Sequence, residues 1–230
     1  KTVTLSFKRP GFAPGDADAD TMEALAHMAE LFSAGEARLT HEQNVMLPWV
    51  FESDLPAVYE VAHALGLATP NINLLTDVIA CPGGDFCSLA NARTLHIADH
   101  VLQRYQDVNE VLDIGPIDLH MSGCINSCGH HHSGHIGILG VDKDGKEWYQ
   151  VTLGGADGTT LSGPAIGGKV VGPAFCAAEI PDVLEALLRT YRALRQPGEL
   201  FIDALRRIGH DPFKAAANAA RHPRAEAAAI

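Results

Sequence analysis

Four of the five cysteines stand in two short pairs, and these pairs are the residues of this sequence best suited to chemistry. Cys81 and Cys87 belong to CPGGDFC, and Cys124 and Cys128 belong to CINSC. Four thiolates that converge on one point would bind either zinc or an iron–sulfur cluster. Paired zinc ligands are usually separated by two to four residues, and the gap in CPGGDFC is longer. The spacing favours an iron–sulfur cluster, with zinc or unrelated thiols as the alternatives.

Glycines accompany both cysteine pairs. Pro82 lacks a backbone N–H and favours a turn, while Gly83 and Gly84 allow the backbone to approach a sulfide closely. Gly123 and Gly129 flank the second pair in the same way. Backbone amides near a cluster can donate to its sulfurs and raise its potential. This composition is typical of a loop that binds a cluster.

The fifth cysteine and a run of histidines are expected to have other roles. Cys176 stands among small apolar residues, which predicts a buried core thiol. His130, His131 and His132 are consecutive, and consecutive side chains of an extended segment point to opposite sides. We therefore expect the histidines to pack against a cofactor or to hydrogen-bond to its carboxylates, rather than to bind a metal.

The elements that must position these residues begin with residues 1–71. Hydrophobic patterns there predict the order strand, helix, strand, strand, helix, which is most of a ferredoxin-like α/β sandwich. Asp20 is the expected N-cap of the first helix, with Glu23 as its capping-box partner. The expected strands are 2–7, 37–40 and 44–50, and the second helix is expected to begin at Ser53 or Asp54, with Pro56 in its first turn.

Residues 72–213 carry both cysteine pairs and predict a second domain. The expected elements are a helix at 88–105, a strand at 117–124, a hairpin of 135–142 with 147–155, and helices from Pro181 and at 199–208. The Ala-rich residues 214–230 are expected to form a flexible tail. The predicted fold class is α+β, with a ferredoxin-like α/β sandwich lobe followed by a mixed α/β lobe.

Composition excludes several functional classes. A formal net charge of −11 without a Lys/Arg-rich block argues against binding to nucleic acid or to an anionic membrane surface. The sequence has no apolar run of about 18 residues and no apparent signal peptide, so we expect neither a membrane span nor secretion. Paired cysteines in a cytoplasmic protein bind metals or act in redox chemistry more often than they form disulfides. Because the chain begins at Lys1, we expect it to be a piece of a longer protein.

Three segments resemble the sulfite/nitrite reductase hemoprotein family, and in particular its bacterial nitrite/sulfite reductase type. The segments are ARLTHEQNVMLPWV, ACPGGDFCSLANAR and MSGCINSCGHHHSGHIGILG, within a similarity that covers residues 35–213. Cysteines of that family, spaced C-x5-C and C-x3-C, hold a [4Fe–4S] cluster. The resemblance implies that Cys81, Cys87, Cys124 and Cys128 are cluster ligands and that Cys128 also bridges to the iron of siroheme.

The resemblance also implies further cofactor-binding residues. Asn126, in the middle of CINSC, matches a position that lies against the macrocycle. Arg38, Gln43 and Asn44, in RLTHEQN, match a motif near the siroheme. Reductases of this type have two similar halves, and this chain resembles only the C-terminal one. Because the Arg and Lys residues that bind the anion belong mainly to the other half, no catalytic residue is predicted here.

The implied function is the six-electron reduction of sulfite to sulfide, or of nitrite to ammonia. The implied partners are the missing N-terminal half and an electron donor, which is either ferredoxin or an NADPH-dependent flavoprotein. Two other functional classes remain open at this point. One is an electron-transfer or cofactor-binding half-module without complete catalysis, and the other is a zinc-stabilised structural domain.

Overall fold

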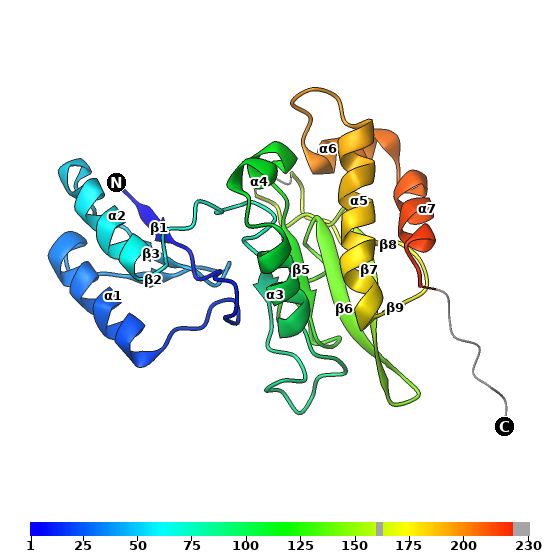
Figure 1. The fold of residues 1–230 in the computed structure, drawn as a ribbon, viewed down its shortest axis with the longest axis horizontal. Coiled ribbons are helices and arrows are strands. Elements are labelled where there is room, and N and C mark those ends of the chain that lie inside the picture. Colours follow the sequence, from blue (N-terminus) through cyan, green and yellow to red (C-terminus); the bar gives the residue numbers. More distant parts are fainter. Residues whose placement is uncertain (160–162, 223–230) are drawn as a thin grey trace.

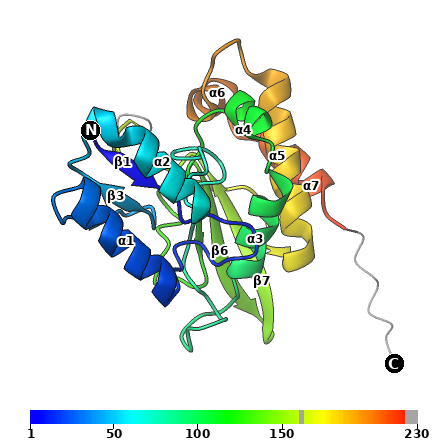
Figure 2. The same ribbon diagram turned by 60° about the vertical axis from the view of Figure 1, so that its left-hand side comes forward.

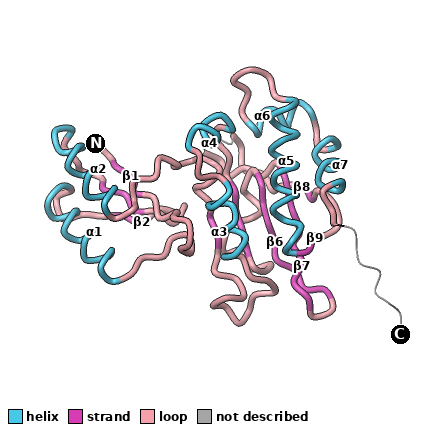
Figure 3. The backbone as a smooth tube through the Cα atoms, viewed as in Figure 1, coloured by secondary structure: helices cyan, strands magenta, loops and turns pink. Residues whose placement is uncertain are grey.

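The computed structural model describes residues 1–159 and 163–222, which form two lobes joined near residue 70. The smaller lobe lies at the left of Figure 1 and contains the N-terminus. The larger lobe contains a mixed sheet with helices packed against it, as the secondary-structure colours of Figure 3 show. None of the described helices is both long and apolar enough to cross a membrane.

The first lobe has the predicted order strand, helix, strand, strand, helix. Its strands pair antiparallel in the order β1-β3-β2, and its core includes Leu5, Leu25, Leu47 and Val58. This arrangement confirms the ferredoxin-like lobe, although the strands are shorter than expected. The elements are β1 (Val3–Leu5), α1 (Ala19–Phe32), β2 (Arg38–Leu39), β3 (Val45–Leu47) and α2 (Leu55–Ala64), with a 3-10 turn at Glu52–Asp54 before α2.

Helix α1 begins two residues before the expected position. The side chain of Asp18 accepts a hydrogen bond from the backbone N–H of Thr21 at 2.8 Å, so Asp18 is the N-cap. The prediction that Asp20 caps the helix was wrong, because Asp20 lies inside the first turn. A carboxylate is favourable at both positions, since it faces the positive end of the helix dipole.

The second lobe is built on a sheet of order β4-β5-β6-β7-β8, with β9 also paired to β7. Strands β4, β5 and β6 run parallel, and β6 and β7 form the predicted antiparallel hairpin. Helices α3 and α5 lie side by side over one face of this sheet (Figures 1 and 2). The elements are β4 (Ile79–Ala80), α3 (Leu95–Arg104), α4 (Val108–Ile114), β5 (Leu119–Ser122), β6 (Ile136–Lys143), β7 (Lys146–Leu153), β8 (Lys169–Val170), β9 (Phe175–Cys176), α5 (Ile180–Leu194), α6 (Phe201–Ile208) and α7 (Asp211–Ala219).

The helix expected at 88–105 begins only at Leu95, so the residues before it form a loop. In this loop the backbone N–H groups of Asn91 and Ala92 donate to the carbonyl of Gly123, at 2.9 and 3.1 Å. The Thr94 hydroxyl donates to the carbonyl of Cys81. These long-range bonds replace the local bonds that a helix would need.

The Ala-rich tail also differs from its prediction. Residues 211–219 form helix α7, and Phe213 and Ala217 are buried in the core of the second lobe. Alanine has the highest helix propensity of the amino acids, and these two side chains provide the apolar contact that holds the helix in place. The expectation of a flexible segment was therefore wrong for residues 214–219, and residues 223–230 lie outside the described residues.

Candidate cofactor site

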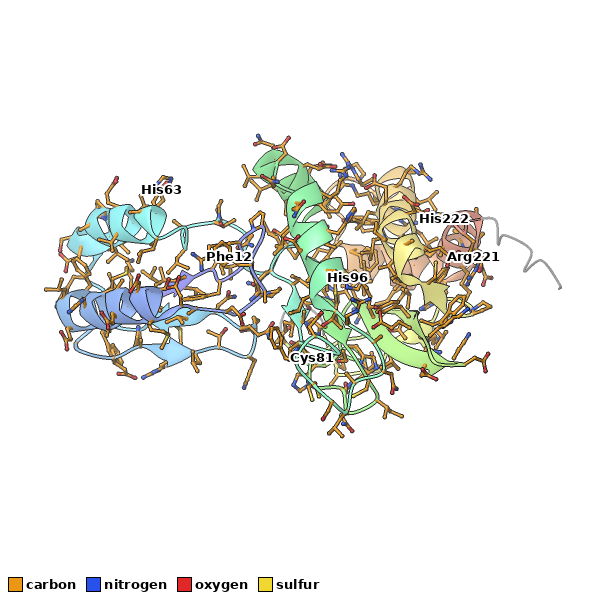
Figure 4. The ribbon with its side chains drawn as sticks, turned by 60° about the horizontal axis from the view of Figure 1, so that its bottom comes forward. Phe12, His63, Cys81, His96, Arg221 and His222 are labelled. Carbon is orange, nitrogen blue, oxygen red and sulfur yellow. The ribbon has the colours of Figure 1, made fainter. Side chains whose placement is uncertain are left out.

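The two cysteine pairs follow directly from neighbouring parallel strands. Cys81 comes immediately after β4, and Cys124 stands two residues beyond the end of β5. Ala80 is the register partner of Met121, and the N–H of Cys81 donates to the carbonyl of Met121 at 3.1 Å. Adjacent strands lie about 4.8 Å apart, so this shared edge brings the two pairs together. Figure 4 shows Cys81 on the side of the second lobe that faces the first.

The two cysteine loops pack backbone against backbone at glycines. A Cβ atom on Gly123 would lie 2.6 Å from the Cα of Gly83 and 2.6 Å from the carbonyl oxygen of Ala92. A Cβ atom on Gly129 would lie 1.9 Å from the carbonyl oxygen of Met121. No larger residue fits at such distances. These glycines therefore make room for neighbouring backbone, which brings the two loops together.

The four thiols differ in exposure. Cys124 is buried, Cys81 and Cys87 are half-buried, and Cys128 is exposed. All five cysteines of the chain are free thiols. The N–H of Gly123 donates to the Sγ of Cys81 at 3.1 Å, so one loop provides a backbone donor to a sulfur of the other. Such donors stabilise the negative charge of a ligating thiolate.

The donor set fits a [4Fe–4S] cluster, which takes four cysteine thiolates. Within residues 1–159 and 163–222, no three His, Cys, Asp or Glu side chains are grouped as they would be around a single metal ion. A four-iron cluster does not require such a group, because each thiolate binds a different iron. The fit rests on the number and type of the thiols and on the contact between their loops.

Gln43 and Asn44 lie beside the strand that carries Cys81, but their amides bind protein groups. The Nε2 of Gln43 donates to the carbonyl of Ala80 at 2.9 Å, and its Oε1 accepts from the N–H of Ala80 at 3.0 Å. Asn44 is 2% exposed, and its Nδ2 donates to the Oδ1 of Asp77 at 2.8 Å. The Oδ1 of Asn44 accepts from the N–H of Phe7 at 3.0 Å. Both residues thus connect the first lobe to the segment before Cys81.

The other two predicted cofactor-binding residues are exposed. Asn126 lies in the same loop as Cys124 and Cys128. Arg38 is on the edge strand β2, where its Nε is 2.6 Å from a carboxylate oxygen of Glu36. Among the interactions of the described residues, none connects Arg38 to the cysteine loops. The structure therefore brings Asn126 to the site and leaves Arg38 paired within the first lobe.

A buried ion pair between the lobes was not predicted from the sequence. The Nζ of Lys8 lies 3.7 Å from the Oδ1 of Asp77, with side chains 0% and 3% exposed. Lys8 also donates to the carbonyls of Gln43, at 3.0 Å, and of Glu42. Burial lowers the pKa of Lys8 to about 8 and raises the pKa of Asp77. No local pattern could have indicated this pair, because its two members belong to different lobes.

The histidine run surrounds Ser127 of the second cysteine loop. The Oγ of Ser127 lies 3.1 Å from the Nδ1 of His131 and 2.7 Å from the Nδ1 of His132. His131 is buried, and desolvation lowers its pKa to about 4, so it is neutral at pH 7. His130 and His132 also line a cavity of 940 Å³ between the lobes. That these histidines pack against a cofactor or hydrogen-bond to its carboxylates stays a prediction.

Cys176 is only half-buried, so the expectation of a buried core thiol was wrong. It ends β9, and its N–H donates to a carboxylate oxygen of Glu179 at 2.8 Å. Glu179 also accepts from the N–H of His222 at 3.1 Å, which connects this region to the end of the described chain. Cys176 is therefore part of a structural corner at the end of β9, whereas the two cysteine pairs lie in loops that follow β4 and β5.

The fold and site define a class of protein: a two-lobed α/β protein with the thiolate donor set of an iron–sulfur cluster at one edge of its larger sheet. Residues 4–65 match the nitrite/sulfite reductase ferredoxin-like half domain. Residues 73–223 match the nitrite and sulphite reductase 4Fe-4S domain. The chain belongs to the nitrite/sulfite reductase family. Its members are oxidoreductases, and their cofactors are the predicted [4Fe–4S] cluster and siroheme.

Curated relatives include both types of reductase. The chain is 32% identical over 209 residues to chloroplastic ferredoxin–nitrite reductase from Spinacia oleracea, covering 86% of this chain and 34% of the relative. It is 30% identical over 215 residues to sulfite reductase [ferredoxin] 2 from Mycolicibacterium paratuberculosis, covering 89% of this chain and 38% of the relative. The chain thus spans little more than a third of the length of these relatives.

Solved structures have the same fold. The Mycobacterium tuberculosis NirA protein matches with a TM-score of 0.67 and 26% identity, over 92% of this chain and 39% of that one. Dissimilatory sulfite reductase I matches with a TM-score of 0.75 over 100% of this chain and 73% of that one. Its identity is only 15%, so this second match supports the fold alone.

Proposed function

We propose that this chain is the C-terminal half of an assimilatory sulfite or nitrite reductase that depends on siroheme and a [4Fe–4S] cluster. The observation that carries the proposal is the placement of two cysteine pairs after β4 and β5, inside the region that matches the 4Fe-4S domain. The reaction is the six-electron reduction of sulfite to sulfide or of nitrite to ammonia. Nitrite reductases and sulfite reductases match this chain to a similar degree, so we propose both nitrite and sulfite as substrates.

The residues of this chain would hold and tune the cofactors. Cys81, Cys87, Cys124 and Cys128 would bind the cluster, and Cys128, the exposed member of the set, would also help to hold the siroheme. When bound, these groups supply single electrons and a Lewis-acidic iron for the anion. The N–H of Gly123 would stabilise the charge on the Cys81 thiolate, and Asn126 would lie beside the macrocycle.

The remaining part of the enzyme would supply what this chain lacks. An anionic substrate such as sulfite or nitrite needs positive groups around it, and this chain has 17 Lys and Arg against 28 Asp and Glu. We propose that the N-terminal half supplies those groups and that this chain alone does not turn over. The relatives named above use ferredoxin, which we propose as the donor, with an NADPH-dependent flavoprotein as the alternative. The five free thiols favour a reducing compartment, which we propose to be the cytoplasm.

The experiment that tests the proposal replaces Cys128 by Ser in the complete enzyme. The variant should keep most of its fold, because the Cys128 side chain is exposed, and should lose the electronic coupling between cluster and siroheme together with sulfite or nitrite reduction. The coupling is measured by electron paramagnetic resonance and by the absorption spectrum. A Cys176→Ser variant is the matched control. Normal anion reduction by the Cys128 variant would contradict the bridging role.

A half-module that binds cofactors without complete catalysis is the second candidate, and the excess of 28 Asp and Glu over 17 Lys and Arg favours it. Both candidates predict the same cofactors in this chain. They differ in turnover when the N-terminal half is present, which is measured by supplying a chemical reductant and sulfite to the reconstituted chain with and without that half. Sustained sulfide production only when both halves are present would contradict the half-module. Sulfide production by this chain alone would contradict both candidates and would show that this chain contains a complete anion site.

A further inference from the structure

The segment that leads into Cys81 is held from the first lobe at both ends. Asn44 donates to Asp77 at one end, and Gln43 forms two hydrogen bonds with Ala80 at the other. Lys8 fixes the turn that carries these two residues, because its Nζ donates to the carbonyl of Gln43. We name this set, Lys8, Gln43, Asn44, Asp77 and Ala80, the inter-lobe latch.

Gln43 serves as a substitute strand partner for β4. Strand β4 is at the edge of its sheet, and its other side is paired with β5. The N–H and C=O of Ala80 would otherwise be unpaired edge groups, and the amide of Gln43 satisfies both, at 3.0 and 2.9 Å. Ala80 is 1% exposed, so little solvent reaches it to replace these bonds. The next residue along the chain is Cys81.

The backbone of Gln43 indicates that its side chain is needed at this position. Gln43 has φ +57°, a left-handed conformation that glycine and asparagine adopt far more readily than glutamine. A turn that required only this conformation would be served better by one of those residues. Glutamine has the length to reach Ala80 in the other lobe, and the inter-lobe latch keeps the disfavoured backbone in place.

We propose that Gln43 is a positioning residue for Cys81: through Ala80 it fixes the first thiol of the donor set relative to the first lobe. This role differs from direct contact with the siroheme, because it acts through the two hydrogen bonds to Ala80. The inference rests on the proposed function in one respect, which is that Cys81 binds an iron–sulfur cluster. The contact itself belongs to the folded chain and is testable without any cofactor.

The test uses the metal-free chain under anaerobic, reducing conditions, with Gln43→Ala and Gln43→Gly as variants. The glycine variant accommodates the left-handed backbone, so it separates loss of the amide from backbone strain. Gln106→Ala is the matched control, because Gln106 donates one side-chain bond to the carbonyl of Gln103 and lies outside the inter-lobe latch. The readouts are hydrogen exchange at the Ala80 amide and the iodoacetamide alkylation rate of each cysteine, both by peptide mass spectrometry.

Both Gln43 variants should raise exchange at Ala80 and alkylation of Cys81 by about tenfold, since two hydrogen bonds are lost. Cys124 follows β5, which the inter-lobe latch does not hold, so its alkylation rate should stay unchanged, as should all rates in the control. Unchanged rates at Ala80 and Cys81 would overturn the proposal. An equal rise at Cys81, Cys124 and Cys176 would also overturn it, because that pattern indicates general loosening of the fold.

A second measurement connects the inter-lobe latch to the cofactor. After anaerobic reconstitution with iron and sulfide, the Gln43 variants should release iron to a chelator about tenfold faster than the wild-type chain and the control. A release rate equal to that of the wild type would overturn the positioning role while leaving the proposed function intact. Failure of the wild-type chain to take up a cluster would contradict the proposed function, and the metal-free rates would still decide whether Gln43 holds Cys81.

Discussion

The backbone N–H of Gly123 donates a hydrogen bond to the Sγ of Cys81, with 3.1 Å between the two atoms. The donor belongs to the second cysteine loop and the acceptor to the first, so the bond joins the two loops through a thiol that we assign to the cluster. Gly123 has no side chain because the Cα of Gly83 occupies the space in which a Cβ would lie. The same close approach that excludes a side chain therefore places an amide beside the sulfur.

Replacement of Gly129 by Ala should disrupt this arrangement. The added Cβ would lie 1.9 Å from the carbonyl oxygen of Met121, a backbone atom that cannot move without distorting β5. We expect the free energy of unfolding to fall by about 3 kcal/mol, the upper range for overpacking, as measured by urea denaturation. Gly167→Ala is the control, because its Cβ would have no atom within 4 Å. Equal stabilities of the two variants would contradict the packing described here.

The buried Lys8 should make stability depend on pH in the alkaline range. Its folded-state pKa of about 8 lies below the ordinary value of 10.5, so between these pH values the unfolded chain binds more protons than the folded chain. The free energy of unfolding therefore rises with pH across this window, and the cost of the buried charge is fully present below pH 8. The expected contribution is on the order of 3 kcal/mol.

Lys8→Met isolates this effect, because the variant lacks the titrating group. The difference in unfolding free energy, wild type minus variant, should increase between pH 8 and 10.5, and this comparison cancels the titration of cysteines and tyrosines. Chemical denaturation at several pH values in this range measures it. Burial raises the pKa of Asp77 above its ordinary value. A constant difference across the range would contradict a charged, buried Lys8.

His131→Ala should leave the iron content of the reconstituted protein unchanged. The Nδ1 of His131 is hydrogen-bonded to Ser127, and the four cysteines already complete the donor set. Iron and acid-labile sulfide are counted in the variant and in Cys87→Ser, which should lose much of its cluster. A fall in iron for His131→Ala comparable to that for Cys87→Ser would make the histidine a ligand.

Cys176→Ala should retain the cofactors and change the free energy of unfolding by about 1 kcal/mol or less, because the side chain is only half-buried. Cys124→Ala, at the buried thiol of the second pair, should lose the cluster. Thermal denaturation and the visible spectrum of each variant separate the two effects. Loss of cluster absorption in Cys176→Ala would assign the fifth cysteine to the site.

Local sequence patterns predicted the elements whose residues interact with near neighbours. The polar turn KDGK between 135–142 and 147–155 identified the β6–β7 hairpin, because the two strands that it joins pair with each other. The pattern failed at 88–94, where the backbone N–H of Ala92 bonds to Gly123 rather than within a helix. It also failed at α7, whose alanines form a helix because Phe213 anchors it to the core.

The sequence likewise predicted those features of the candidate site that depend on residues close together along the chain. Cysteine spacing and the family resemblance nominate the four thiols as cluster ligands, and the strand predicted at 117–124 corresponds to β5, which ends two residues before Cys124. The partners of Gln43 and Asn44 could not be inferred, because Ala80 and Asp77 lie in the other lobe. Long-range pairing of this type depends on how two lobes meet, and the residues next to Gln43 and Asn44 along the chain carry no local signal for it.

The most direct test of the central claim is the visible absorption spectrum of the anaerobically reconstituted chain, with iron, acid-labile sulfide and zinc counted on the same sample. We expect cluster absorption with about four irons and four sulfides per chain, and loss of both in the Cys124→Ala variant. Bound zinc with a featureless spectrum, or a cluster that survives the loss of Cys124, would contradict the assignment of the four cysteines.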